Sequence, residues 1–356
     1  MKIKIGIIGA SFAKAAYLPA LKHIDNIEVT AISSARLENA KSCAEEFNIP
    51  KYYDNWKKML DQHKFDLICI ATPTDLHAPI AIYALERGAH VLAEKPTAMN
   101  ADEAKQMLDI ATKHNRIHMM DHELRFNPNR MKIKEWISSD LIGKIQHINI
   151  TNISNGWLDP SSRPQNDWWS LSERGGGRMG ANGSHQVDLL RWWCGEVKSV
   201  FGQLHTIVKE RKDKVTNKKW QATADDLSYF SLEMESGTLA NVFMSGVASH
   251  VLGNKTQIFG NKGSIIIEDK NEEIYFAKKN EEFKKFYYED PNSSLEGINR
   301  GIWNVSVVGL LRELIGAISE NRQLNKGATF IDGLKNQIIL DAVKESTVER
   351  KWIDLQ

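Results

Sequence analysis

The stretch KIKIGIIGASFA, residues 2–13, decides the fold of the first part of the chain. Lys2 to Ile8 is typical of a buried strand, and a turn of small residues begins at Gly9 and leads into a helix. Proteins hold the pyrophosphate of a dinucleotide with such a strand, turn and helix. Gly9 permits the tight turn. The expected contacts with the dinucleotide are Gly9, Ser11, Phe12 and Ala13, with Ser11 and Ala13 where this fingerprint has its second and third glycines. The alternative is a tight turn that binds nothing.

Strand and helix patterns continue to alternate as far as residue 123. Strands are predicted at 2–8, 28–32, 51–53, 65–71, 89–93 and 117–120, and helices at 37–47, 56–62, 77–87 and 101–114. Short connections between them call for parallel strands with right-handed crossovers. We therefore expect an α/β Rossmann domain, a doubly wound parallel sheet, over residues 1–123.

The pattern changes after residue 123. A helix is predicted at 128–138, then strands at 145–153, 197–208, 227–233, 238–244, 256–258, 264–268 and 273–276, with a charged loop at 209–219 and helices at 305–319 and 331–348. Turn signals such as Glu235-Ser236-Gly237 separate several of the strands. This pattern predicts an α+β domain at 124–356 with a mostly antiparallel open sheet. Its C-terminal helix is a candidate to pack back on the first domain.

Composition limits the class of protein. The chain has 356 residues, with 46 Lys and Arg against 45 Asp and Glu, so no charge excess attracts nucleic acid or an anionic membrane. No apolar run approaches the ~20 residues of a membrane span, and no signal peptide precedes the first strand, which indicates a cytoplasmic location. Cys43, Cys69 and Cys194 are widely separated and fit reduced thiols better than a disulfide framework or a zinc site.

The end of the second strand bears on which dinucleotide binds. An acidic residue at this position accepts hydrogen bonds from a ribose 2′-hydroxyl, whereas an arginine suits a 2′-phosphate. The chain has Ser33, Ser34 and Arg36 here and no acid before Glu38. NADP(H) is therefore favoured, with NAD(H) as the other option. The alternative for Arg36 is a solvated residue at a helix start.

Several later motifs resemble one family. They are Ala71-Thr72-Pro73-Thr74-Asp75-Leu76-His77, the stretch from Ala84 to Glu94-Lys95-Pro96, Arg125-Phe126-Asn127-Pro128, Gly175-Gly176-Gly177, Gly183-Ser184-His185-Gln186-Val187-Asp188 and Phe330-Ile331-Asp332-Gly333. In this order and spacing they resemble the Gfo/Idh/MocA oxidoreductases over nearly the whole chain. The resemblance implies an N-terminal nucleotide domain and a C-terminal open sheet that covers the nicotinamide and often mediates oligomerisation, here as a homodimer or homotetramer. It also adds Thr72, Pro73, His77, Glu94 and Lys95 to the cofactor-binding residues.

The resemblance implies two catalytic residues. Lys95 matches the lysine that contacts the substrate hydroxyl, and His185 matches the acid/base histidine. Both roles suit the chemistry, because oxidation of an alcohol carbon releases the O–H proton as hydride leaves. An imidazole with a pKa near ~6.5 can take that proton, and an ammonium stabilises the developing charge or relays the proton. The alternatives are a surface lysine before a proline and a packed histidine at a helix start.

Position 181 departs from the family pattern. The resemblance implies an aspartate four residues before His185, and this chain has Ala181. The missing carboxylate would orient the catalytic groups and stabilise a cationic imidazole. Glu123 and Asp167 are candidates to replace it. Otherwise the protein is a non-catalytic sensor of nucleotide and sugar, or it uses a tightly bound cofactor for a redox-neutral elimination or glycoside cleavage.

Two further clusters are candidates for substrate binding. His122, Glu123 and Arg125 are expected at the mouth of the substrate pocket. His118 and His122 would share a face if the strand continued, but without a further ligand motif a metal site is less favoured. A second cluster offers indole faces with amide and guanidinium groups, which suit a sugar ring; it comprises Trp157, Arg163, Asn166, Trp168 and Trp169. The alternative is that these tryptophans pack the domain or a subunit interface.

Together these features predict an NADP(H)-preferring oxidoreductase that acts on a sugar, polyol or related hydroxy compound.

Overall fold

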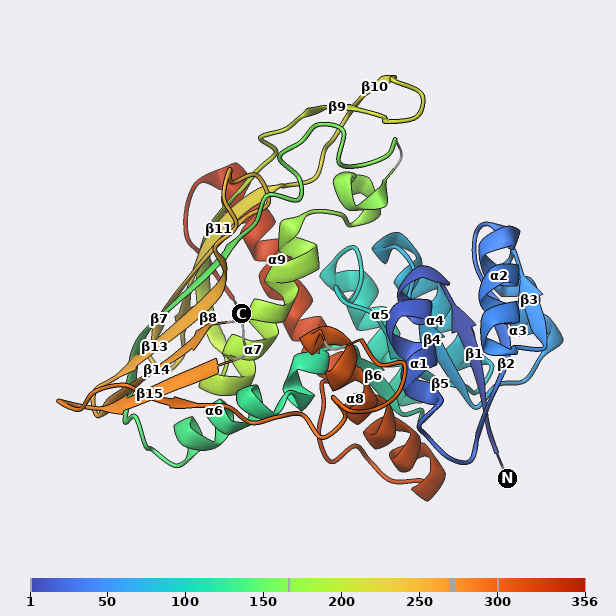
Figure 1. Ribbon diagram of the computed structural model, residues 1–356, viewed down its shortest axis with the longest axis horizontal. Coiled ribbons are helices and arrows are strands. Elements are labelled where there is room, and N and C mark those ends of the chain that lie inside the picture. The colour runs from blue at the N-terminus through green and yellow to red at the C-terminus, as the bar shows by residue number, and fades with distance from the viewer. Residues whose placement is uncertain (1, 166, 269–272, 300, 356) are drawn as a thin grey trace. The chain divides into compact units, whose positions relative to one another are not determined.

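The computed structural model describes residues 2–165, 167–268, 273–299 and 301–355 (Figure 1). The chain divides into two compact units. The first comprises Met1–Asn127 and Asp290–Lys335, and the second comprises Pro128–Glu289 and Asn336–Gln356. From the sequence we expected one division, after residue 123, which would have placed residues 290–335 in the second domain. The structure has them in the first.

The first unit contains a six-stranded parallel sheet with strand order β3-β2-β1-β4-β5-β6. Its strands are β1 (Ile3–Ile8), β2 (Ile27–Ser33), β3 (Lys51–Tyr53), β4 (Leu67–Ile70), β5 (His90–Ala93) and β6 (His118–Met120). The strand order reverses beside β1, which leads first outward to β2 and β3 and then back to β4. The predicted doubly wound parallel sheet is confirmed.

Helices cover both faces of this sheet. They are α1 (Leu18–Leu21), α2 (Leu37–Phe47), α3 (Trp56–Gln62), α4 (His77–Glu86), α5 (Ala101–Lys113) and α8 (Ile302–Glu320). Side chains alternate along each strand, so Ile5 and Ile7 pack in one core with α1, α2 and α8. Ile68 and Ile70 point to the opposite face and pack with α3, α4 and α5.

The second unit is built on a nine-stranded sheet with order β16-β15-β14-β13-β7-β12-β11-β8-β17. Its strands are β7 (Ile145–Ile153), β8 (Val197–His205), β11 (Leu227–Met234), β12 (Leu239–Ser245), β13 (Gly253–Gly260), β14 (Gly263–Glu268), β15 (Glu273–Lys278), β16 (Lys284–Phe286) and β17 (Ile353–Asp354). All neighbours are antiparallel except β7 and β12, which confirms the mostly antiparallel sheet.

One face of the large sheet is covered and the other is open. Helices α6 (Pro128–Ser138), α7 (Ser184–Cys194) and α9 (Phe330–Glu349) belong wholly or in part to this unit. The Ser346 hydroxyl of α9 accepts a hydrogen bond from the Gly202 N–H in β8 at 3.0 Å. On the other face, Tyr229, Leu239 and Phe243 are exposed. Successive side chains of β11 and β12 therefore point in turn to the covered face and to the open face, which gives these strands their pattern of alternating buried and exposed residues.

The segment predicted as a charged loop at 209–219 is a hairpin, so that prediction is wrong at both ends. Glu210–Lys212 forms β9 and Lys219–Gln221 forms β10, with Arg211 directly opposite Trp220. Both of these side chains are buried, whereas their charged neighbours are exposed. A strand of three residues with one inward side chain is too short to show the alternation of apolar and polar residues by which strands are predicted from sequence.

Two expectations concern the chain as a whole. The three cysteines are free thiols, as expected, with Cys43 and Cys69 buried. Among the described helices, none combines the length and apolar character needed to cross a bilayer.

Candidate functional site

The turn after β1 is shaped by a close approach of two backbone segments. Gly9 has φ +103°, and a Cβ there would lie 2.1 Å from the Ala71 carbonyl oxygen, so no other residue fits. The chain then turns into a π-helical segment, Ala13–Tyr17, with Ser11 exposed, Phe12 half-buried and Ala13 buried. N–H groups in the first turn of a helix have no intrahelical acceptor and favour an anion. Such a turn can hold a pyrophosphate, and dinucleotide binding at these residues stays a prediction.

The end of β2 carries hydroxyl groups and one cation. Ser33 is buried, and its carbonyl oxygen accepts the Gly9 N–H at 2.8 Å, which joins this strand end to the turn after β1. Ser34 is half-buried and Arg36 is exposed at the start of α2. The Arg36 side chain makes no capping hydrogen bond to this helix. Its guanidinium is thus not used to cap α2.

His77 connects the segments that follow β4 and β5. Its Nδ1 lies 2.8 Å from the Pro96 carbonyl oxygen and its Nε2 lies 2.9 Å from that of Thr72. Burial lowers the pKa of His77. These contacts give His77 a structural role that holds the Thr72-Pro73 and Lys95-Pro96 segments together. The Thr72 hydroxyl is buried and, within the described structure, has no hydrogen-bond partner, so it can serve a ligand.

Lys95 lies at the carboxyl end of β5 beside a group of buried acids. Its Nζ is 3.7 Å from Glu94 Oε2, and the side chain is 13% exposed. Glu94 Oε1 accepts a hydrogen bond from the Tyr17 hydroxyl at 3.0 Å, and Asp121 Oδ2 lies 2.8 Å from the same hydroxyl. Glu123 completes the group, and burial raises its pKa to about 8 although the Lys95 charge opposes this. A cation beside buried acids is suited to moving protons.

The residues after β6 are buried in a short turn, Glu123–Phe126. The strand ends at Met120, as predicted, so His122 lies outside it and does not share a strand face with His118. His118 instead stacks on Phe330, and its Nδ1 accepts the Phe330 N–H at 3.0 Å. Among the described residues, no group of three or more His, Cys, Asp or Glu side chains is arranged to hold a metal ion.

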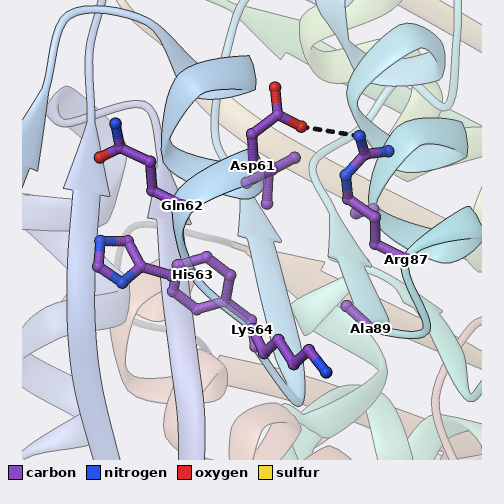
Figure 2. Close-up of a pocket in the computed structure, with 9 residues that line it drawn as sticks. Asp61, Gln62, His63, Lys64, Arg87 and Ala89 are labelled. Atoms are coloured by element: carbon purple, nitrogen blue, oxygen red, sulfur yellow. Dashed lines mark hydrogen bonds and ion pairs between the residues drawn. The ribbon is translucent and has the colours of Figure 1, made fainter.

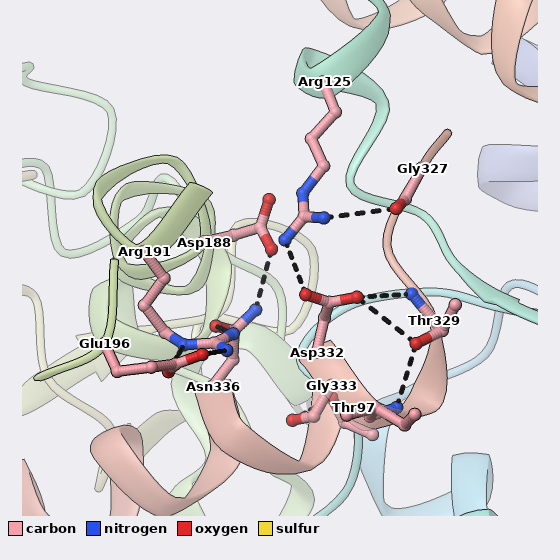
Figure 3. A network of polar contacts seen from close by, with 11 residues as sticks. Thr97, Arg125, Asp188, Arg191, Glu196, Gly327, Thr329, Asp332, Gly333 and Asn336 are labelled. Carbon is pink, nitrogen blue, oxygen red and sulfur yellow. Dashed lines mark hydrogen bonds and ion pairs between the residues drawn. The ribbon is translucent and has the colours of Figure 1, made fainter. Parts of the chain in front are cut away.

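Arg125 ties the turn after β6 to the start of α9. Its Nη2 lies 3.0 Å from Asp332 Oδ1, and its Nη1 donates to the Gly327 carbonyl oxygen at 3.1 Å (Figure 3). Asp332 Oδ2 also accepts the Thr329 N–H at 2.9 Å. The Arg125 side chain is 8% exposed, so these contacts indicate a structural contribution in addition to the predicted substrate-binding role.

In the second unit, His185 is the second residue of α7 and is buried, with 3% exposed. It follows a π-helical turn, Met179–Gly183, which contains Ala181. Single turns of π-helix occur frequently at functional sites. Further along α7, Asp188 Oδ1 accepts a hydrogen bond from Asn336 Nδ2 at 3.0 Å (Figure 3). This contact gives Asp188 a structural role.

The three glycines at 175–177 allow close packing beside the π-helical turn Met179–Gly183. A Cβ on Gly176 would lie 2.4 Å from the Trp168 carbonyl oxygen, and one on Gly177 would lie 2.0 Å from Asp225 Oδ1. Asp225 Oδ2 accepts the Met179 N–H at 2.9 Å, at the first residue of the π-helical turn. The motif is therefore required by close packing under the turn that carries Ala181 and leads to His185.

The aromatic and cationic cluster gathers on loops of the second unit. Trp168 and Trp169 stack with ring centroids 4.3 Å apart, and the Arg163 guanidinium lies 5.0 Å from the Trp157 ring. Arg163 also pairs with Asp167 at 3.0 Å. Trp157 is buried, whereas Arg163, Trp168 and Trp169 are half-buried. Asn166 lies outside the described residues.

Three residues beside these clusters were missed by the sequence analysis as site residues. Arg211 is 1% exposed, its guanidinium lies 5.9 Å from the Trp157 ring, and it pairs with Asp226 at 3.7 Å. Tyr17 and Asp121 belong to the acid group beside Lys95. The sequence did contain a signal for Asp121, because this acid directly follows the apolar strand β6, much as Lys95 follows β5 after one intervening residue. Arg211 had none, because it lies in a charged segment.

A separate pocket lies at the opposite edge of the parallel sheet. It has a volume of about 330 Å³ and is lined by Leu60, Asp61, Gln62, His63, Lys64, Phe65, Ala84, Arg87 and Ala89 (Figure 2). Arg87 and Asp61 form an ion pair of 2.7 Å at its rim. These segments precede β4 and β5, whereas ligands of open α/β sheets bind beyond the carboxyl ends of the strands. The geometry therefore does not favour this pocket for the dinucleotide.

Two family models match the chain. One, described as the oxidoreductase family with an NAD-binding Rossmann fold, matches residues 3–122, and the other, the GFO/IDH/MocA C-terminal domain, matches residues 131–266. The chain belongs to the Gfo/Idh/MocA family of oxidoreductases. It is a nicotinamide-dependent oxidoreductase. The family predicted from the lysine and glycine-histidine motifs is confirmed.

Curated relatives and solved structures agree with this assignment. The chain is 26% identical to an uncharacterised oxidoreductase of Synechocystis sp., with 99% of this chain and 95% of the relative covered. It is 27% identical to a levoglucosan dehydrogenase of Pseudarthrobacter phenanthrenivorans, with 91% and 88% covered. A solved levoglucosan dehydrogenase in complex with NADH and levoglucosan is similar with a TM-score of 0.89 and 25% identity, covering all of both chains.

The first unit of this oxidoreductase fits a nicotinamide dinucleotide. The crowded Gly9 brings the turn after β1 against Ala71, and the buried Thr72 hydroxyl has no partner in the described structure. Hydroxyl groups at the end of β2 and the cation of Lys95 after β5 lie at the same edge of the sheet, because the strands are parallel. Pyrophosphate, ribose and nicotinamide each have a suitable group among these residues.

Proposed function

We propose that this oxidoreductase transfers hydride between a nicotinamide and the hydroxyl or carbonyl carbon of a sugar, polyol or related compound. The observation that carries the proposal is Lys95 at the carboxyl end of β5, next to the buried acids, in a dinucleotide-binding sheet. The similarity to a levoglucosan dehydrogenase over 91% of this chain supports the sugar class.

In the proposed reaction, Lys95 and His185 have different roles. The bound nicotinamide supplies the hydride acceptor in oxidation and the donor in reduction. The Lys95 ammonium stabilises negative charge that develops on the substrate oxygen. The His185 imidazole takes the O–H proton in oxidation and returns it in reduction. Glu94 orients Lys95 through the ion pair described above.

The test of this proposal is a nicotinamide absorbance assay over a panel of sugars, polyols and keto-sugars with both cofactors. On the responding compound, Lys95→Ala and His185→Ala are each expected to lower kcat by about a hundredfold or more. Lys113→Ala, at the exposed end of α5, serves as the control for loss of a lysine. Full turnover of Lys95→Ala or His185→Ala would refute that residue's assignment.

Arg36, with Ser33 and Ser34, supports a preference for NADP(H) over NAD(H). A guanidinium at the end of β2 suits a 2′-phosphate, and no acid lies between the end of β2 and Glu38 to accept a hydrogen bond from a ribose hydroxyl. The solved relative contains NADH, so a direct measurement is required. Calorimetric titration of Arg36→Ala is expected to show weaker NADPH binding and unchanged NADH binding. Equal losses for both cofactors would contradict the preference.

Substrate recognition is assigned to two sets of residues. We assign His122, Glu123 and Arg125 in the first unit, and Trp157, Arg163, Trp168 and Trp169 in the second. Half-buried indole and guanidinium groups suit stacking on and hydrogen bonding to a polyhydroxylated ring. Trp168→Ala is expected to raise KM more than it lowers kcat, because stacking holds the substrate and the transition state alike. Unchanged KM would indicate that this indole only packs the domain.

Because Ala181 stands where the family has an aspartate, two alternative functions are tested by the same assay. A sensor of nucleotide and sugar would bind cofactor and show no turnover with any compound. A redox-neutral elimination or glycoside cleavage would form product without net change in nicotinamide absorbance. Product analysis by chromatography alongside the absorbance trace separates these outcomes from oxidation or reduction.

The open face of the large sheet supports a homodimer or homotetramer. Phe243 lies directly opposite Tyr229, and Phe201 lies 6.4 Å from the Tyr229 ring on the next strand. Trp352 extends this aromatic row at 6.0 Å from Phe201. Exposed apolar patches of this kind mark protein contacts. Light scattering should show an oligomer that Phe243→Lys dissociates, and a monomeric wild type would contradict this.

The cytoplasmic location remains a prediction, which cell fractionation tests.

A further inference from the structure

Arg178 carries a buried positive charge directly before the turn that leads to His185. The residue is only 8% exposed, and the π-helical turn Met179–Gly183 begins at the next position. A guanidinium stays charged at any ordinary pH. Because a buried charge is costly unless an opposite charge compensates it, buried arginines are normally paired with carboxylates. The contacts of Arg178 therefore indicate whether its charge serves the fold or a ligand.

The hydrogen-bond partner of the Arg178 guanidinium is uncharged. Its Nη2 donates to Asn152 Oδ1 in β7, and its Nε has no hydrogen-bond partner within the described structure. Among the described residues, no carboxylate lies close enough to this guanidinium to form an ion pair. Burial lowers the pKa of Arg178, and the charge of Asp225 opposes this only in part.

Asp225 does not supply the missing partner, because its carboxylate contacts the backbone of the turn. Its Oδ2 accepts the Met179 N–H at 2.9 Å, and its Oδ1 lies 2.0 Å from where a Cβ on Gly177 would be. Burial raises the pKa of Asp225 to about 7, so at neutral pH about half of this acid is uncharged.

Other arginines of the second unit show the usual pairing. Arg163 lies 3.0 Å from Asp167, and Arg191 lies 2.9 Å from Glu196. Arg191 is as buried as Arg178, with 7% of the residue exposed. Arg178 therefore differs from a comparably buried arginine of the same unit in that no described acid forms an ion pair with it.

Arg178 also lies beside the loop assigned to substrate recognition. Its partner Asn152 is the last buried residue of β7, which leads into the loop that carries Trp168. A Cβ on Gly176 would lie 2.4 Å from the Trp168 carbonyl oxygen. Directly opposite Asn152 in β13 is Asn254, whose Oδ1 accepts a hydrogen bond from Asn152 Nδ2. Amide groups and a guanidinium are thus gathered at the end of the sheet that meets this loop.

We propose that Arg178 binds a carboxylate of the substrate, so that this oxidoreductase acts on an acidic sugar or a related polyhydroxylated acid. This inference rests on the proposed function and narrows its substrate class. A guanidinium binds a carboxylate through two parallel N–H···O bonds, and the Nε of Arg178 offers one of them. One guanidinium matches the single charge of a carboxylate better than the double charge of a phosphate monoester. Arg178 is then a specificity-determining residue.

The first test measures binding without turnover. The ligands are pairs that differ in one carboxylate: methyl glucuronide and methyl glucoside, methyl galacturonide and methyl galactoside, and gluconate and glucitol. None has a free carbonyl that NADH or NADPH could reduce, so calorimetric titration in the presence of either cofactor reports binding alone. At least one acid should bind the wild type about tenfold or more tightly than its neutral partner. Glucose 6-phosphate is included as an anion of another kind.

Variants of Arg178 should remove this preference. Arg178→Gln is expected to lower the affinity for the acid on the order of a hundredfold. Arg178→Lys keeps the charge but loses the paired N–H bonds, so its affinity for the acid should lie between those of wild type and Arg178→Gln. Arg191→Gln, which changes a paired arginine, is the matched control and should keep the preference for the acid. Acids that bind no more tightly than their neutral partners, tighter binding of glucose 6-phosphate, or a preference that survives in Arg178→Gln would each overturn the proposal.

Thermal unfolding without ligand separates substrate binding from a structural role. Removal of a buried cation that has no ion-pair partner should leave the Tm of Arg178→Gln equal to or above that of the wild type. Arg191→Gln breaks a buried ion pair and should unfold at a lower temperature. A lower Tm for Arg178→Gln, together with an unchanged preference for the acid, would mean that Arg178 only holds the turn.

These outcomes are distinguishable from those of the proposed function. Arg178-dependent binding of an acid without any change in nicotinamide absorbance would support this inference and contradict hydride transfer to such compounds. Turnover of a neutral sugar with no preference for its acid would refute this inference and leave the proposed function intact. Where an acid is turned over, Arg178→Gln should raise KM for the acid more than it lowers kcat, because the carboxylate is held alike in substrate and transition state. Equal losses of kcat on the acid and its neutral partner would indicate that Arg178 positions His185 instead.

Discussion

Glu123 shows how burial of a single residue couples proton binding to stability. Burial raises its pKa from 4.5 to about 8 in the folded chain, so between these values the folded state holds more protons than the unfolded state. The free energy of unfolding should therefore fall as pH rises from about 4.5 through about 8, by at most roughly 5 kcal/mol from this group.

Glu123→Gln should remove this part of the pH dependence. Urea unfolding at several pH values is expected to give a flatter profile for the variant than for wild type. Glu173→Gln is the comparison, because hydrogen bonds lower the pKa of Glu173 and it should not destabilise the fold at rising pH. Parallel profiles for Glu123→Gln and wild type would show that Glu123 is not protonated near neutral pH.

Gly9 is a residue for which backbone and space both exclude a side chain. Gly9→Ala would place Cβ 2.1 Å from the Ala71 carbonyl oxygen at φ +103°, and it should lower the free energy of unfolding by about 3 kcal/mol or more. Gly237→Ala is the control, since Gly237 has φ +81° but nothing within 4 Å of its Cβ. It should cost only about 1 kcal/mol. Equal losses in thermal unfolding would mean that the contact with Ala71 is not decisive.

At the scale of elements, the π-helical turn Met179–Gly183 depends on one buried acid. Asp225 Oδ2 accepts the Met179 N–H, and burial raises the pKa of Asp225 to about 7. Asp225→Ala should destabilise the second unit by about 2 kcal/mol, because a buried N–H loses its acceptor. In Asp225→Ala, the backbone N–H groups of residues 179–185 should also exchange hydrogen faster than in the wild type. Asp225→Asn keeps an acceptor and should lose less; equal exchange in all three proteins would contradict this account.

At the scale of the whole molecule, α9 belongs to both units. Residues 330–335 cluster with the first unit and residues 336–349 with the second, within one continuous helix. A proline inside a helix removes a hydrogen bond and costs about 3 kcal/mol. Lys335→Pro is therefore expected to split one calorimetric unfolding transition into two, whereas Lys335→Ala should keep one. Two transitions in the wild type would show that the helix does not couple the units.

Much of the fold could be predicted because its signals are local. Lys2 to Ile8 followed by Gly9 indicates a buried strand and a tight turn, and the continuous apolar strand at Leu67–Ile70 indicates a sheet buried on both faces. The hairpin of β9 and β10 escaped prediction, since strands of three residues in a charged segment show no period. Residues 290–335 escaped because membership of a unit depends on contacts between distant segments.

The site divides in the same way. The sequence by itself determined the family, the dinucleotide turn and the candidacy of Lys95 and His185, because these depend on residue type at short, ordered spacings. Only the tertiary structure brought Tyr17, Glu94 and Asp121 together, from positions up to 104 residues apart, and made their proton balance a property of the site. Burial and mutual distance set the pKa of an acid, and neither is encoded at any single position of the chain.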